Sequence, residues 1–166
     1  NKNGGINGWL SELAFAPVDF NENAMQDEWS GDIGVGCKYF SQDAVIKLAE
    51  YGGFKFEEGL TPAQKLKVIQ ALMAKDDALA TQIYEDIGVY LAHTIPFYAK
   101  FYDINHMLLL GRVMGGKGGD IILATCKETL AAEYPEFATL DIGLPDENNR
   151  RVGQSIAAAS LPANLD

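Results

Sequence analysis

A glycine-rich segment at 105–120, NHMLLLGRVMGGKGGD, constrains the fold of this chain more than any other stretch. The apolar run 107–110 predicts a buried strand, and a helical pattern, IILATCKETLAAEY, follows Asp120. A strand, a glycine turn and a helix N-terminus in this order can hold a phosphate or nucleotide, because glycine lets a ligand reach the backbone N–H groups. The same order also serves as a strand-to-helix connection that binds nothing, so the two interpretations stand side by side.

The segment comes close to a Walker A phosphate-binding loop. Gly111, Gly116 and Lys117 satisfy the spacing G-x-x-x-x-G-K. Gly118, however, stands where that loop needs a Ser or Thr hydroxyl to hold Mg²⁺. Five glycines between 111 and 119 also make a chance match easy. A true P-loop is therefore the less favoured interpretation.

The overall composition predicts one globular domain, spanning 1–166. The chain carries 13 basic and 23 acidic side chains, and its net charge of −10 disfavours a nucleic-acid-binding surface. No apolar run is long enough to span a membrane. Cys37 and Cys126 form no disulfide framework, which favours a reducing, cytoplasmic compartment. The polar start, NKNGG, lacks an initiating Met, and we expect a fragment of a longer protein.

Capping residues and apolar periodicity predict a helix-rich α/β class in which helices flank a small sheet. Ser41 caps one helix, and Thr61 with Gln64 forms a capping box for the next. Asp76 or Asp77 starts the longest helix. The predicted helices lie at 42–51, 62–74, 76–102, 120–134 and 147–160, the predicted strands at 9–10, 13–16, 107–110 and 138–142, and a polar loop at 21–36.

The titratable residues form no evident catalytic or metal-binding set. His93 and His106 are the only histidines, and their places in mid-helix and at a strand entrance favour packing or boundary roles. Asp27, Glu28 and Asp32 indicate a solvated acidic loop. No Ser-His-Asp or nucleophile-elbow pattern appears in the sequence.

Glu12 is an acid set between apolar residues, so it either faces solvent in a bend or contacts a polar ligand. The sequence around it, GWLSELAF at 8–15, resembles the G-x-x-G-E-x-G-H motif of the ROK family. That family comprises sugar kinases and sugar-responsive repressors built on the actin-like ATPase fold. Glu12 is retained, whereas Ser11 and Phe15 replace the second Gly and the His. The resemblance implies that Glu12 hydrogen-bonds a sugar hydroxyl.

A second ROK motif, C-x-C-G-x-x-G-C-x-E, corresponds to SGDIGVGCKY at 30–39. In the family, three of its cysteines and the preceding His bind a zinc ion. Here Cys37 is retained, but Ser30 and Asp32 replace the other two cysteines, and the His is lost. Because a structural zinc ion needs about four N, S or O ligands, we expect none in this chain. We expect packing of three aromatic side chains to hold the loop instead: Trp29, Tyr39 and Phe40.

The glycine segment itself also resembles the family. LLLGRV at 108–113 is similar to the V-V-L-G-G-G-V strand end on the adenosine side of ROK proteins, with Arg112 in place of the second Gly. A Gly-x-x-x-Ala-Ala pattern at 153–158 resembles the family's final helix. The resemblance implies the C-terminal subdomain of an actin-like (ribonuclease H-like) ATPase fold that binds ATP with Mg²⁺. The implied nucleotide-binding residues are Gly111, Arg112, Gly115, Gly116 and Lys117.

The resemblance implies an ATP-dependent kinase for a hexose such as glucose, homodimeric and cytoplasmic when intact. The family's first phosphate loop, catalytic Asp and second phosphate loop precede the part that corresponds to this chain, so we expect no catalytic residue within it. Two other functions stay open: a non-catalytic sugar-sensing module of a transcriptional repressor, and a structural or dimerisation domain. Ser11, Phe15 and Arg112 favour altered or lost activity, although Arg112 could instead contact phosphate.

Overall fold

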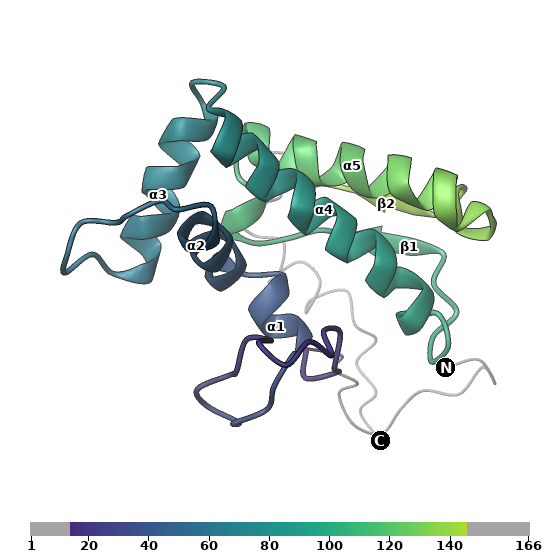
Figure 1. Cartoon of the computed structure of the whole chain (residues 1–166). Coiled ribbons are helices and arrows are strands. Elements are labelled where there is room, and N and C mark those ends of the chain that lie inside the picture. Colours follow the sequence, from purple (N-terminus) through teal and green to yellow (C-terminus); the bar gives the residue numbers. More distant parts are fainter. Residues whose placement is uncertain (1–13, 146–166) are drawn as a thin grey trace, which may run out of the picture.

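Two long helices, α4 (Ala78–Tyr98) and α5 (Lys117–Glu133), form the centre of the fold (Figure 1). The structure, a computed structural model, describes residues 14–145. Asp77 caps α4 by accepting a hydrogen bond from the Ala80 N–H at 3.0 Å, as the sequence predicted. The helix ends at Tyr98 rather than at 102, and Pro96 lies within its last turn. The predicted longest element is thus confirmed apart from its final residues.

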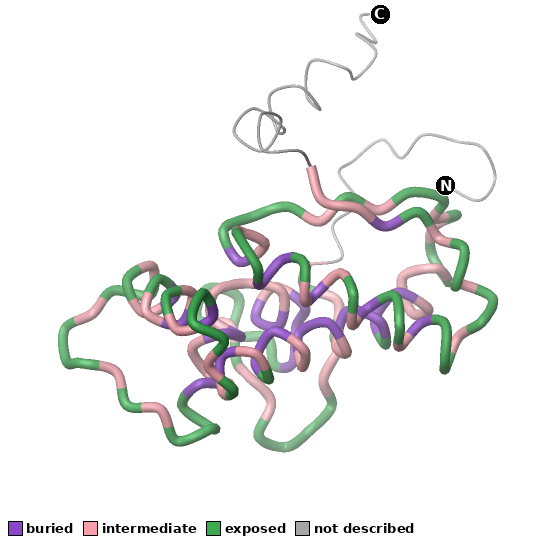
Figure 2. The backbone as a smooth tube through the Cα atoms, turned by 90° about the horizontal axis from the view of Figure 1, so that it is seen from above, coloured by how far each residue is buried: buried purple, intermediate pink, exposed green. Residues whose placement is uncertain are grey.

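Three shorter helices, which precede α4 in the sequence, pack against this pair. They are α1 (Gly36–Tyr39), α2 (Gln42–Tyr51) and α3 (Pro62–Met73). Ser41 accepts a hydrogen bond from the Asp43 N–H, and the capping box of Thr61 and Gln64 is complete, so both predicted helix starts are confirmed. Buried residues lie mostly where the helices face one another, while exposed residues dominate the loops (Figure 2).

Two short strands, one on each side of α5 in the sequence, form a parallel sheet. β1 (His106–Leu108) pairs with β2 (Asp141–Gly143), with Met107 opposite Ile142, and α5 forms the crossover between the strands. Two 3₁₀ helices flank α5: η1 (Arg112–Met114) and η2 (Pro135–Phe137). The predicted class, helix-rich α/β with a small sheet, is confirmed at this level.

The predicted strands differ from the observed ones in length and burial. The run 107–110 is not a fully buried strand, since β1 ends at Leu108 and the side chains of Leu108 and Leu110 are 57% and 43% exposed. The physical reason is that the sheet has only two strands among the described residues, so β1 has a single neighbouring strand in this part of the chain. Residues 14–16 form a turn and a bend rather than a strand, and only Pro17 makes a bridge, to Val35.

Helix α5 begins at Lys117, three residues before the predicted start at Asp120. Gly118 and Gly119 therefore belong to the helix and not to the turn. The predicted strands before residue 14, Glu12 and the predicted helix 147–160 lie outside the described residues. Among residues 14–145, every helix is too short or too polar to cross a lipid bilayer.

Candidate functional site

A cavity of about 700 Å³ lies between α3, the turn at residues 111–116 (the glycine turn) and the start of α5. Four of the five predicted nucleotide-binding residues form one of its walls: Arg112, Gly115, Gly116 and Lys117. Gly111 does not line the cavity, but it begins the turn that carries the others. The structure therefore brings most of the predicted set together around one hollow.

Four of the five glycines of this segment fall into two groups with different structural roles. Gly111, with φ 113°, and Gly116, with φ 66°, shape the turn, because side-chain-bearing residues rarely adopt such angles. Gly118 and Gly119 are buried inside α5 and allow close packing. A Cβ atom at Gly118 would lie 2.8 Å from Cζ of Tyr84, and one at Gly119 would lie 2.8 Å from the carbonyl carbon of Met114. The lack of a side chain at Gly118 and Gly119 is thus required for the packing of α5 against the core.

The wall of this cavity is positively charged in a chain whose net charge is −10. Lys67 of α3 faces Arg112 and Lys117 across it, and none of the described residues that line it is acidic. The Lys117 ammonium forms an ion pair with Asp76 at the entrance of α4, which offsets part of its charge. No side chain caps the N-terminus of α5, so the positive end of the helix dipole adds to the field. Such a wall suits an anionic ligand.

Two further polar side chains lie at or near this cavity. Gln70 lines it, and its Nε2 donates to the Arg112 carbonyl oxygen at 2.9 Å and so ties the turn to α3. Tyr84 is fully buried beneath Gly118, and within residues 14–145 its hydroxyl makes no well-formed hydrogen bond. Burial raises the pKa of Tyr84 to about 12, although the Gln70 amide partly opposes this rise. The only sequence signal for Lys67 and Gln70 was their i, i+3 spacing on the polar side of α3.

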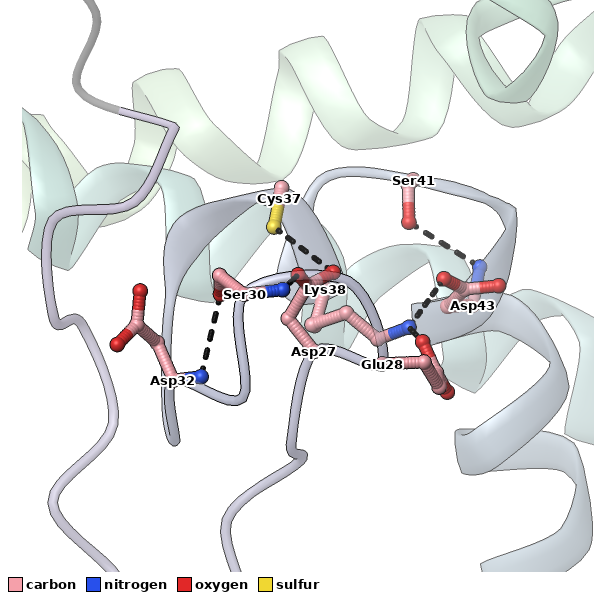
Figure 3. A network of polar contacts seen from close by, with 8 residues as sticks. All are labelled: Asp27, Glu28, Ser30, Asp32, Cys37, Lys38, Ser41 and Asp43. Carbon is pink, nitrogen blue, oxygen red and sulfur yellow. Dashed lines mark hydrogen bonds and ion pairs between the residues drawn. The ribbon is translucent and has the colours of Figure 1, made fainter.

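The buried side chain of Lys38 joins two parts of the chain: the loop that precedes α1, and helix α2. Lys38 Nζ lies 2.7 Å from both Glu28 Oε2 and Asp43 Oδ2, and its side chain is 7% exposed (Figure 3). Burial by itself would lower the pKa of Lys38, but hydrogen bonds to Asp43 and Glu28 raise it to about 12. Glu28 is 83% exposed, as the predicted solvated acidic loop requires, and it also pairs with a cation that sequence spacing did not reveal.

The same loop corrects one expected packing contact. Trp29 is 86% exposed and touches Phe15 at 5.7 Å between ring centroids, so it does not hold the loop in the core. Tyr39 is buried and Phe40 half-buried, as expected. The Tyr39 hydroxyl accepts from the Met25 N–H at 3.1 Å and donates to the Asp19 carboxylate, which ties the first part of the loop to α1.

Cys37 lies in this network as a protonated thiol. Burial and the Asp27 carboxylate raise its pKa, and its Sγ lies 3.9 Å from Asp27 Oδ1 (Figure 3). Ser30 donates its backbone N–H to Asp27 at 2.8 Å. Within residues 14–145, no three His, Cys, Asp or Glu side chains are grouped to hold a metal ion. The absence of zinc from the whole chain remains a prediction.

The two histidines connect elements. His93 Nδ1 lies 2.8 Å from the Tyr134 hydroxyl, which joins α4 to the end of α5. His106 Nδ1 lies 2.9 Å from Asp141 Oδ2, across the first pair of the sheet. His106 is solvent-exposed rather than packed, so its role is that of a boundary residue.

Comparison of the chain with family models, with curated proteins and with solved structures finds no match.

Proposed function

We propose that the chain is the nucleotide-facing part of a ROK-type sugar kinase, on the C-terminal subdomain of an actin-like ATPase fold. The observation that supports this best is the cavity at the glycine turn. It combines a cationic wall, an uncapped helix N-terminus and four residues that the resemblance independently assigns to ATP. Its volume suits a nucleotide-sized ligand.

In this proposal the two sides of the cavity bind different parts of ATP. Arg112, Lys117 and the first N–H groups of α5 bind phosphate oxygens, since charge-assisted hydrogen bonds are the stronger ones. Ala63 and Ala74, at the two ends of α3, offer a small apolar surface for the base. Mg²⁺ would arrive with the phosphates of ATP.

Transfer to a sugar needs groups that lie outside the described residues. Glu12 would hydrogen-bond a hydroxyl of a hexose such as glucose, and a catalytic Asp in a preceding half would deprotonate the attacking hydroxyl. We further propose that the intact protein is a cytoplasmic homodimer. Residues 14–145 would then bind nucleotide without catalysing transfer.

A non-catalytic sugar sensor of the repressor type is the second candidate. The ion pair between Lys117 and Asp76 favours it, because it occupies a cation that a kinase would direct at phosphate. Arg112 also favours it, because it stands where the kinases of the family are expected to have a glycine. A purely structural domain would use neither feature.

The test is titration of the full chain with ATP and Mg²⁺ by calorimetry. We expect binding that Lys67→Ala and Arg112→Ala each weaken about tenfold, since each variant removes one charge-assisted contact. Lys127→Ala is the matched control, because Lys127 is exposed on α5 and does not line this cavity. Loss of affinity in the control as large as in the two variants, or no nucleotide binding by the unaltered chain, would contradict the proposal.

A further inference from the structure

A second cavity, of about 650 Å³, lies between the segment 17–25 and helices α2 and α4. It shares no lining residue with the cavity at the glycine turn. Its volume lies within the range of small-molecule sites, and the function proposed above makes no use of it. The sequence suggested only packing or boundary roles for two of its lining residues, Tyr39 and His93.

The walls of this cavity are rich in aromatic rings from separate elements. Tyr39 and Tyr90 meet edge to face with 5.8 Å between their centroids, and Phe97 continues the wall two turns further along α4. Phe20 and Tyr51 line it as well and are 85% and 65% exposed. Large aromatic side chains left in water are costly, so a ligand with a flat apolar body would gain by covering them.

Two opposite charges also line this cavity, and neither has an ionic partner in the part of the chain that the structure describes. Asp19 accepts hydrogen bonds from the Tyr39 hydroxyl and from the Asn21 N–H, the latter at 2.9 Å, but no cation pairs with it. The Lys47 ammonium stands 4.9 Å from the centroid of the Tyr51 ring, and no carboxylate pairs with it. Asp19 and Lys47 do not pair with each other, so both keep binding capacity.

The Tyr90 hydroxyl offers a third polar contact. Among residues 14–145 it makes no hydrogen bond, whereas the neighbouring Thr94 hydroxyl already donates to the Tyr90 carbonyl oxygen at 2.7 Å. Burial, with Asp86 and Asp19 nearby, raises the pKa of Tyr90, so the group stays a hydrogen-bond donor at neutral pH.

We propose that this cavity binds a small zwitterionic amino acid with an aromatic side chain. Its ammonium group pairs with Asp19, its carboxylate pairs with Lys47, and its ring lies among Tyr39, Tyr90 and Phe97. A ligand with only a positive charge would leave Lys47 facing a like charge, and one with only a negative charge would do the same at Asp19. The zwitterion satisfies both, which is the basis of the expected selectivity.

Three probes of the same ring test this assignment on the full chain: phenylalanine, phenethylamine, which lacks the carboxylate, and 3-phenylpropionate, which lacks the ammonium. Ligand-observed NMR or calorimetry gives each affinity. We expect phenylalanine to bind about tenfold more tightly than either of the others. Asp19→Asn should weaken phenylalanine and phenethylamine about tenfold and should strengthen 3-phenylpropionate, because it removes the like charge. Lys47→Met should weaken phenylalanine and 3-phenylpropionate and should strengthen phenethylamine for the same reason.

The controls separate ligand contacts from folding. Asp19→Asn keeps an oxygen that can accept from the Tyr39 hydroxyl, and the melting temperature of each variant shows whether the loop is intact. Asp103→Asn and Lys127→Met carry the same charge changes at exposed positions that do not line the cavity and should alter no affinity. No binding of phenylalanine up to about 10 mM would overturn the proposal. Affinities that do not follow this crossed pattern in the two variants would overturn it too.

Discussion

Replacing Gly88 by leucine is expected to lower the free energy of unfolding by about 3 kcal/mol. Gly88 lies where α4 crosses α5, and a Cβ atom there would be 2.8 Å from Cβ of Thr125 and 2.9 Å from the Ile122 carbonyl oxygen. The carbonyl belongs to the backbone of α5, so the two helices would have to separate. Leucine has the higher helix propensity, which by itself would stabilise α4, so a loss must come from packing. Urea unfolding followed by circular dichroism measures the change.

Gly143→Ala is the matched control for this prediction. Gly143 lies in β2, and a Cβ atom there would meet nothing within 4 Å. We expect its effect to stay within about 0.5 kcal/mol. If Gly88→Leu proved as harmless as this control, the close crossing of α4 and α5 would not be a feature of the folded chain.

The second large effect is expected at Lys38. Lys38→Met should lower the free energy of unfolding by about 1 kcal/mol, because it removes two ion pairs whose acidic partners are accessible to solvent, while the methionine keeps most of the apolar stem in place. Hydrogen exchange should rise at the backbone amides of 25–36, which this residue holds against α2. Lys127→Met, at an exposed position on α5, should leave both readouts unchanged. Equal exchange in the two variants would show that Lys38 does not hold the loop.

The same network predicts how stability depends on pH. Backbone hydrogen bonds lower the pKa of Asp27 below 3.8, and the Lys38 ammonium lowers that of Glu28 below 4.5. Their contributions are present above those values and are lost as pH falls through the lower values of the folded state. The Lys38 contribution is complete below pH 10.5 and is lost as pH rises through about 12. Unfolding midpoints measured from pH 3 to 7 should fall on the acid side, and less steeply in Lys38→Met.

The helix starts could be predicted from the sequence because their causes are local. Ser41, Thr61 and Asp77 each accept a hydrogen bond from an N–H two or three residues further on, so the pattern carries the whole explanation. The predicted start of α5 was wrong because a run of glycines favours a turn. In the structure Gly118 lies within the helix, where it packs against the ring of Tyr84. That contact joins residues far apart in the sequence, and no local rule anticipates it.

The same distinction between local and long-range causes applies to the candidate site. The glycine turn was visible as a run of residues, and the structure places Arg112, Gly115, Gly116 and Lys117 in one wall. Lys67, which faces them, comes from another helix and reads as one more polar residue on a helix surface. The Lys38 ion pairs and the second cavity were missed for the same reason, since side chains from separate elements form both.

The small sheet has a consequence for handling the protein. Among the described residues, β1 and β2 each use only one hydrogen-bonding edge, so each strand presents a row of open backbone groups on its other side. Leu108 and Leu110, both exposed, lie on and just after β1. An open strand beside exposed leucines is a template for pairing with a second copy, and Leu110→Lys should raise the concentration at which this chain stays monodisperse.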